Sequence, residues 1–182
     1  MADFTEQTLP RRQFLRGQFF NTLKTDQVKR QGQNAIRPPW ADLVNFLQKC
    51  TACDACINAC EMQILKRGAG GYPEVDFSVG RKECSFCAAC VNVCQQGVFR
   101  VTGEIAWEHK IEIQQGCLTH IGVECRACED SCEQRAIRFK RTVGGIAKPI
   151  LNLDNCNGCG ACLASCPSDA IQLLQEGIKS AE

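Results

Sequence analysis

The residues best suited to chemistry are cysteines, which number 16 in a chain of 182 residues and fall into four runs. The first, second and fourth runs have the spacing C-x2-C-x2-C-x3-C, and a proline directly follows the fourth. Gaps of two residues let a tight loop hold three thiolates around one metal cluster, while the fourth thiolate points toward a second cluster. The runs are Cys50, Cys53, Cys56 and Cys60; Cys84, Cys87, Cys90 and Cys94; Cys117, Cys125, Cys128 and Cys132; and Cys156, Cys159, Cys162 and Cys166.

This spacing predicts [4Fe–4S] clusters rather than zinc or disulfides. A zinc site usually takes its ligands as two separate pairs, which three closely spaced cysteines do not offer. Disulfides would require an oxidising compartment and therefore an export signal. In a compartment that keeps thiols reduced, clustered cysteines more often bind metal.

The N-terminus contains part of such an export signal. In TLPRRQFLRG, Thr8 to Gly17, the pair Arg11 and Arg12 resembles the charged part of a twin-arginine signal. Residues 17–40 contain four basic side chains and no continuous apolar stretch of the length that a translocase accepts. No window approaches the roughly 18 apolar residues that span a bilayer. We therefore expect a cytoplasmic chain with no membrane span.

A longer repeat relates the runs to one another. Adding 72 to seven of the eight cysteine positions in the first two runs gives the cysteine positions of the last two. The exception is Cys50, whose counterpart is Gly122, with Cys117 five residues earlier. The chain is therefore expected to contain two tandem copies of one unit.

The predicted fold class is α+β: two tandem bacterial-type 2[4Fe–4S] ferredoxin-like units with a mostly irregular basic N-terminal segment. In each unit we expect a short helix that starts at the fourth cysteine of a run, because two apolar residues follow four and five positions later. Alternating residues predict strands in 72–79 and 148–153, with glycine turns before them. The expected parts are an N-terminal segment 1–45, a first unit 46–103, a linker 104–111 containing Trp107, a second unit 112–176 and a tail 177–182.

The irregular third run leaves two outcomes open. If residues 118–124 form a longer loop that returns Cys117 to the others, the second unit keeps eight ligands and the chain holds four clusters, which is the outcome we expect. Otherwise three full clusters remain, and three cysteines hold a [3Fe–4S] cluster or leave one iron exchangeable. His120 could be a substitute ligand, although an exposed loop histidine is the usual case.

Within each unit, the fourth cysteine of one run is expected to complete the site of the other run. Such crossed sets would tie the two halves of a unit together. A unit of about 60 residues buries little apolar surface, so cluster binding must supply much of its folding free energy. The expected sets are Cys50, Cys53, Cys56 and Cys94; Cys84, Cys87, Cys90 and Cys60; Cys117, Cys125, Cys128 and Cys166; and Cys156, Cys159, Cys162 and Cys132.

The net charge of the chain and of its N-terminal segment indicates which kinds of partner it could bind. A formal charge of +1 gives no general electrostatic argument for nucleic acid. Sixteen thiolates and four oxidised cores of charge +2 would add about −8, which makes the holo-protein acidic. Residues 1–49 contain eight Lys or Arg against four Asp or Glu. This basic segment could dock onto an acidic partner or could be a solvated tail.

Several stretches, taken in order, are similar to the NapF family, the ferredoxin-type accessory proteins of the periplasmic nitrate reductase system. The resemblance covers about residues 36–172 and includes the variant third run. It implies a cytoplasmic protein that binds the precursor of the nitrate reductase catalytic subunit (NapA) before export and assists its maturation, by supplying or reducing its iron–sulfur cluster. The stretches are IRPPW (Ile36 to Trp40), CDACINACE, LKRGAGGYP, ECSFC, VECRACEDSCE and CNGCGACLASCP.

Two other functions compete with the maturation role: electron transfer and catalysis. An electron-transfer ferredoxin that serves an oxidoreductase would have the same cysteines. An enzyme is disfavoured, since the sequence contains no C-x3-C-x2-C run, no G-x-G-x-x-G loop and no phosphate loop.

The IRPPW stretch has two interpretations. It is either a contact for the partner or a polyproline turn with Trp40 packed on the first unit.

Overall fold

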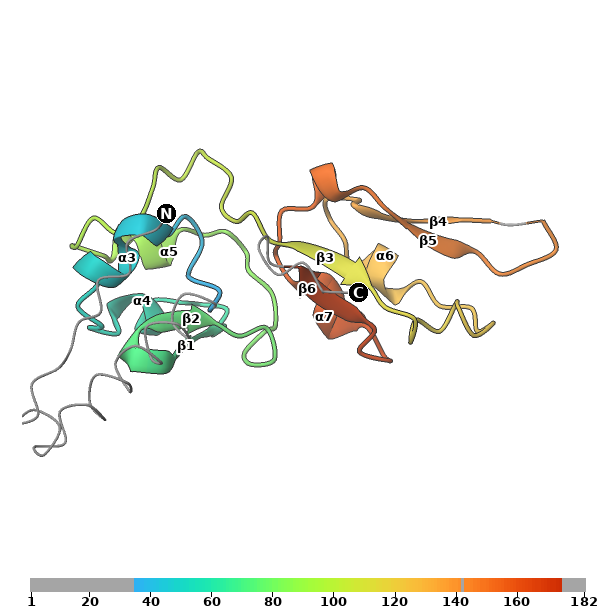
Figure 1. The fold of residues 1–182 in the computed structure, drawn as a ribbon, viewed down its shortest axis with the longest axis horizontal. Helices are drawn as coiled ribbons and strands as arrows, with labels where there is room; N and C mark the ends of the chain where they lie inside the picture. Colours follow the sequence, from blue (N-terminus) through green and yellow to red (C-terminus); the bar gives the residue numbers. More distant parts are fainter. Residues whose placement is uncertain (1–34, 142, 175–182) are drawn as a thin grey trace, which may run out of the picture.

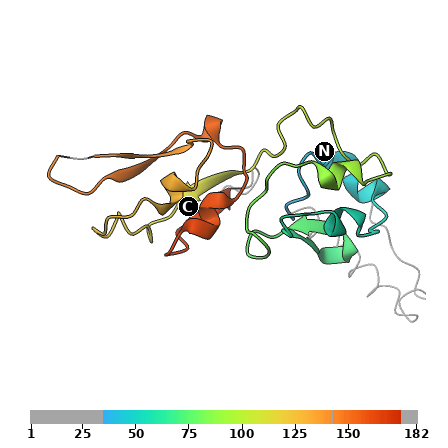
Figure 2. The same cartoon turned by 180° about the vertical axis from the view of Figure 1, so that it is seen from behind.

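The computed structural model describes residues 35–141 and 143–174, which form two lobes that follow one another along the chain (Figure 1; seen from behind in Figure 2). The twin-arginine-like motif and the expected C-terminal tail lie outside the described residues, as does most of the expected N-terminal segment. Each lobe combines short helices with antiparallel strands.

The first unit is built from three short helices and one hairpin. The first of them is capped by Asp42, whose carboxylate accepts hydrogen bonds from the N–H groups of Val44 (3.1 Å) and Asn45 (3.4 Å). The hairpin strands pair antiparallel, with Leu65 opposite Val75. The elements are α3 (Leu43–Lys49), α4 (Ala55–Asn58), β1 (Leu65–Arg67), the 3-10 turn η1 (Ala69–Gly71), β2 (Pro73–Val75) and α5 (Ala89–Asn92).

The second unit contains two separate antiparallel pairs of strands. One pair joins its first and last strands, with Ile113 opposite Ile171. The other is a hairpin that extends outward at the far end of the molecule (Figure 1). The elements are β3 (Lys110–Ile113), α6 (Ala127–Asp130), β4 (Ile137–Lys140), β5 (Lys148–Leu151), the 3-10 turn η2 (Leu153–Asn155), α7 (Ala161–Ser165) and β6 (Ile171–Leu174).

The 72-residue repeat is confirmed in space. A shift of 72 takes α4 onto α6, and takes the start of β1 onto the start of β4. The isolated bridge between Ala41 and Phe99 in the first unit maps onto the pair Ile113 and Ile171 in the second. The two units therefore share one plan, although the first has only a single bridge where the second has a four-residue ladder.

The expected position of the helices was wrong. Each four- or five-residue helix contains the third cysteine of its run and ends before or at the fourth, as α4 does around Cys56. The two apolar residues that follow the fourth cysteine instead lead into a strand, as Ile64 and Leu65 do at β1, or into an isolated bridge in the second run. Both are buried at adjacent positions, a pattern that periodicity alone does not assign to helix or strand. The expected strands within 72–79 and 148–153 are present as β2 and β5.

The IRPPW stretch is part of the packed fold. Trp40 is 5% exposed, and its indole N–H donates to the Glu104 carbonyl at 2.9 Å. The Arg37 guanidinium donates to the Pro73 carbonyl at 3.0 Å, while the Arg37 carbonyl accepts from the Trp107 indole at 2.9 Å. These hydrogen bonds therefore connect the IRPPW stretch to the hairpin of the first unit on one side and to residues 104–107 on the other.

Residues 104–111, expected to be a linker, contain much of the junction between the units. Trp107 and His109 are both 7% exposed, and Lys110 begins strand β3. Trp107 lies in one apolar cluster with Phe77 of the first unit, and Leu163 of the second unit packs against that cluster. The two units thus share a core. No helix among the described residues is both long enough and apolar enough to cross a bilayer.

Gly160, just before α7, offers a test of this shared core. Its φ is +86°, and an added Cβ would lie 2.3 Å from Cδ1 of Phe77 in the other unit. Gly97 has φ +59° with open space around it, so it controls for backbone strain alone. We expect Gly97→Ala to cost about 1 kcal/mol and Gly160→Ala about 1–3 kcal/mol more, measured by anaerobic urea unfolding. Equal losses would contradict the packing of Phe77 on α7.

Candidate iron–sulfur sites

The first group of thiols, site I, draws on both runs of the first unit. Cys50, Cys53 and Cys56 line one cavity together with Cys94, the last cysteine of the second run. Helix α4 carries Cys56, and Cys94 follows α5, whose packing against α4 brings the two runs together. The apolar walls of the cavity come from Phe46, Val98 and Phe99.

The corresponding group in the second unit, site III, includes the displaced cysteine. Cys117, Cys125, Cys128 and Cys166 line a second cavity with Leu118 and Phe139. The loop between the first two of these cysteines turns through a hydrogen bond from the Val123 N–H to the Leu118 carbonyl at 2.9 Å. The structure therefore brings Cys117 to the place that the repeat assigns to Gly122. The other loop candidate, His120, is exposed.

The remaining thiols form site II and site IV. At site II, burial raises the pKa of Cys90 to about 12, and the neighbouring thiols Cys84, Cys60 and Cys87 raise it further. At site IV, burial raises the pKa of Cys162 to about 12, with further increases from its neighbours Cys159, Cys156 and Cys132. At sites I and III the fourth cysteine of one run thus lines a cavity with the three leading cysteines of the other, and the remaining cysteines make up the complementary sets at sites II and IV.

The four sites follow one another in a row. Cys56 of site I is close enough to raise the pKa of Cys90 in site II, and Cys128 of site III does the same to Cys162 in site IV. Between the units, Cys159 of site IV contributes to the raised pKa of Cys84 in site II, whose largest cause is burial. The spatial order is therefore I, II, IV and III.

Left-handed backbone shapes three of the four cysteine loops. The residue before the second cysteine and the residue before the helix both have positive φ, as Ala52 (52°) and Asp54 (62°) do in the first run. Gly158 and Gly160 occupy these positions in the fourth run, and Phe86 and Ala88 in the second. Such strain in non-glycine residues persists where the surroundings demand it. Left-handed residues next to right-handed ones can turn successive N–H groups to one side, and such concavities bind anionic groups, including iron–sulfur clusters.

The third run departs from this pattern. Its residue before α6, Arg126, has φ −136°, and Glu124 before the second cysteine lacks a positive φ. A different interaction holds the first thiol here, because Cys117 Sγ lies 3.3 Å from the hydroxyl of buried Thr119. The longer loop has its left-handed residue elsewhere, at Gly122 (φ +87°), and still keeps the thiol in the site.

Backbone N–H groups point at several of the sulfur atoms. The N–H of Ala52 lies 3.5 Å from Cys50 Sγ, and that of Phe86 lies 3.4 Å from Cys84 Sγ. In the second unit, the N–H of Ala136 approaches Cys132 Sγ at 3.3 Å, and Ala170 approaches Cys166 Sγ at 3.2 Å. Hydrogen bonds of this kind stabilise thiolates and tune the potential of a cluster that the thiolates bind.

Burial also makes the thiols hard to ionise without a metal. It raises the pKa of Cys56, Cys84 and Cys128 to about 11. Such thiols are protonated near pH 7, and metal must displace the proton before the thiolate can bind. Iron binding is therefore coupled to proton release, and acid opposes it.

These groups are suited to clusters rather than to single ions. Among the described residues, no three or more His, Cys, Asp or Glu side chains converge as the ligands of one metal ion would. In a [4Fe–4S] cluster each cysteine binds a different iron, so the four thiols surround the cluster instead of meeting at a point. Four thiols around one cavity, as at sites I and III, fit that requirement.

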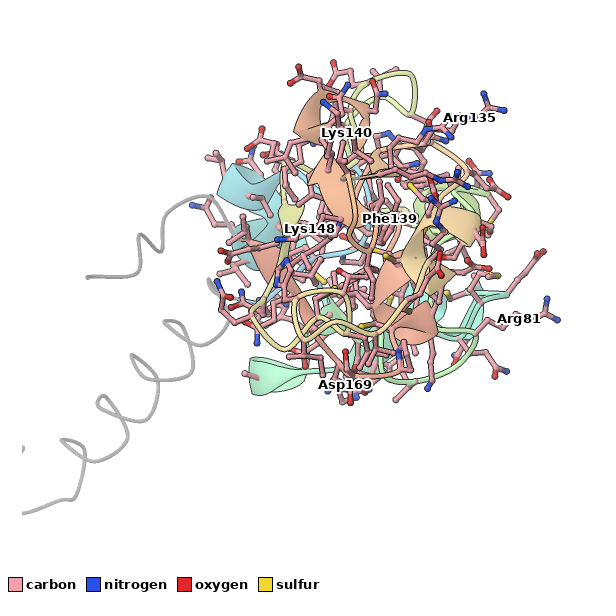
Figure 3. The ribbon with its side chains drawn as sticks, turned by 90° about the vertical axis from the view of Figure 1, so that its right-hand side faces the viewer. Arg81, Arg135, Phe139, Lys140, Lys148 and Asp169 are labelled. Atoms are coloured by element: carbon pink, nitrogen blue, oxygen red, sulfur yellow. The ribbon has the colours of Figure 1, made fainter. Side chains whose placement is uncertain are left out.

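A basic hairpin lies beside sites III and IV. The segment 134–153, which contains β4 and β5, has five Lys or Arg and no Asp or Glu. All five are exposed, and Figure 3 shows Lys140 and Lys148 along this hairpin. This hairpin gives the second unit a positively charged edge, which the overall formal charge of +1 does not indicate.

Comparison with known proteins identifies the class of the two units. Residues 49–99 and residues 123–170 each match a family described as a 4Fe-4S dicluster domain. The chain is therefore a ferredoxin-type iron–sulfur protein with two tandem dicluster domains.

The curated relatives are more specific. The chain is 49% identical to the "Ferredoxin-type protein NapF" of Haemophilus influenzae over 170 residues, which is 93% of this chain and 96% of the relative. It is 54% identical to the protein of that name from Escherichia coli K12 over 143 residues, 78% of this chain and 86% of the relative. A weaker similarity, 28% over 68% of this chain and 46% of the relative, is to one component of an ion-translocating oxidoreductase complex of Methanosarcina acetivorans. This chain belongs to the NapF family of ferredoxin-type proteins.

Sequence reasoning missed several residues that hold the site loops. His109 and Lys110 contact the carbonyl groups of the fourth run, and Phe86 packs on Trp107 at 5.6 Å between ring centroids. Their types carry no metal-site signature. A tryptophan and a histidine in the expected linker are unusual there, but their types alone do not indicate these contacts.

Paired substitutions can test the crossed grouping. If each site binds one cluster, Cys117→Ala with Cys166→Ala removes two thiols from site III alone, and iron should fall from about 16 to about 12 per chain. Cys117→Ala with Cys132→Ala damages sites III and IV, and iron should fall to about 8. The measurement is iron and sulfide content after anaerobic purification.

Both variants lose the same number of cysteines, so they control for each other. If all four ligands of a cluster came from one run, the two results would be reversed. Unchanged iron in Cys117→Ala alone would exclude this residue as a ligand.

Proposed function

We propose that the chain holds four [4Fe–4S] clusters, one in each of sites I to IV, with the 16 cysteines as iron ligands. Four observations support this number: the thiol groups at the cavities, the left-handed residues of three loops, the N–H contacts to sulfur, and the two dicluster matches. A bound cluster supplies one-electron redox chemistry. The surrounding residues hold it and adjust how readily it accepts the electron.

A partner would approach most closely at the first unit. Cys53 of site I and Cys87 of site II are exposed, whereas their counterparts Cys125 and Cys159 are half-buried. A hydrogen bond from the Ala55 N–H lowers the pKa of Cys53. Exposed ligands bring a cluster close to the surface, where a docked protein can exchange electrons or iron–sulfur components with it.

We further propose that the chain acts in the cytoplasm on the precursor of the nitrate reductase catalytic subunit, NapA, and assists its maturation before export. The observation that carries this proposal is the identity of 49–54% to proteins named NapF over 78–93% of the chain. The chain would act by protein contact and by its clusters, without a substrate chemistry of its own.

A second candidate is an electron carrier that serves an oxidoreductase. The continuous row of sites across the unit junction favours it, since an accessory protein that only docks would not need neighbouring thiol groups in both units.

Anaerobic affinity capture of the tagged full-length chain from its own cells would distinguish the two candidates. We expect recovery of a nitrate reductase catalytic subunit that still carries its signal peptide, identified by mass, because maturation precedes export. The control is a strain whose catalytic subunit lacks the signal peptide, processed in parallel.

Recovery of a quinol dehydrogenase or a soluble reductase, with no precursor, would contradict the maturation role. The chain would then be an electron carrier.

A further inference from the structure

The loop of the fourth run, residues 156–159, is held from outside through three carbonyl groups. Lys110 Nζ donates to the Cys156 carbonyl at 2.6 Å, and His109 Nε2 lies 2.9 Å from the Gly158 carbonyl. The Cys84 N–H donates to the Cys159 carbonyl at 2.9 Å. Because a carbonyl only accepts hydrogen bonds, His109 must carry its proton on Nε2. The loop of site IV is thus held by residues of the junction and by the loop of site II.

Close packing accompanies these hydrogen bonds. An added Cβ at Gly158 would lie 2.7 Å from His109 Nε2, so the loop backbone lies directly on the imidazole. The imidazole packs on Trp107 with ring centroids 5.0 Å apart, and Trp107 contacts Phe86 at 5.6 Å. Phe86 lies between Cys84 and Cys87 in the loop of site II. A continuous path of contacts therefore joins the two loops.

The donors also differ in charge. Lys110 brings a positive charge to the Cys156 carbonyl and is partly buried, where solvent screens it less than at the surface. Burial lowers the pKa of His109, which favours the neutral imidazole as a donor. Donors and positive charge near a cluster stabilise its reduced, more negative form.

We propose that His109 and Lys110 are positioning residues: they fix the Cys156–Cys159 loop against the Cys84–Cys87 loop, make sites II and IV neighbours, and raise the reduction potential of the cluster in site IV. Electronic contact between the units then depends on this junction. The proposal goes beyond the maturation role, because it holds for an accessory protein and for an electron carrier alike.

Redox titration of the iron-loaded full-length protein, followed by electron paramagnetic resonance, tests this directly. His109→Phe keeps a ring against Trp107 but removes the donor, and Lys110→Met removes the charge at similar length. Each should make reduction of one cluster about tenfold less favourable, which is about 59 mV for a one-electron couple, with iron content unchanged. His109→Gln and Lys110→Arg, which keep a donor, should restore most of the potential.

Matched controls separate position from charge. Lys148→Met removes an exposed charge from the basic hairpin and should leave all potentials unchanged. Gly158→Ala should press on His109, whereas Gly144→Ala has similar φ (+71° against +78°) and open space around it. Only Gly158→Ala should weaken the magnetic interaction between the reduced clusters of sites II and IV.

Three outcomes would overturn the proposal. The potentials could be the same in His109→Phe, Lys110→Met and the unchanged protein. The shift in Lys148→Met could equal that in Lys110→Met, which would make it a long-range charge effect. The third outcome is that the unchanged protein shows no magnetic interaction between clusters of different units.

Discussion

The constraint on which this fold most depends is the convergence of thiols from the two cysteine runs of each unit. Helices of four or five residues, such as α4 and α7, are too short to be stable alone. Isolated two-stranded ribbons such as β1–β2 are marginal in water. Bonds from one cluster to both runs would hold these pieces together. The folding free energy and the cluster chemistry would then have the same source.

The second constraint is the junction between the units. Trp107 and His109 fill the space between them, and the Cys84 N–H binds the Cys159 carbonyl directly. The cysteines of sites II and IV are consequently near one another, although they are far apart in sequence. A flexible linker would have left two independent ferredoxin units. The buried residues of 104–111 instead make one row of four sites.

The repeat and the positions of several thiols could be predicted from the sequence, because cysteine spacing limits how the loops can fold. The 72-residue repeat is one example, and the return of Cys117 to the cavity of Cys125, Cys128 and Cys166 is another. The helices around Cys56 and its equivalents were predicted one turn too late, since adjacent buried residues such as Ile64 and Leu65 do not distinguish helix from strand. The roles of His109 and Lys110 could not be predicted, because their contacts join segments about 50 residues apart and no local pattern encodes them.

The most direct test is amide hydrogen exchange of the iron-loaded protein before and after anaerobic removal of iron and sulfide. Ile64 and Ile137 are fully buried, one in each unit, and their amides report on the two cores. If shared thiol–cluster bonds hold the units together, protection should be lost at both positions on removal of iron. Protection that persists at either position would show that the apolar core of that unit is sufficient without its clusters.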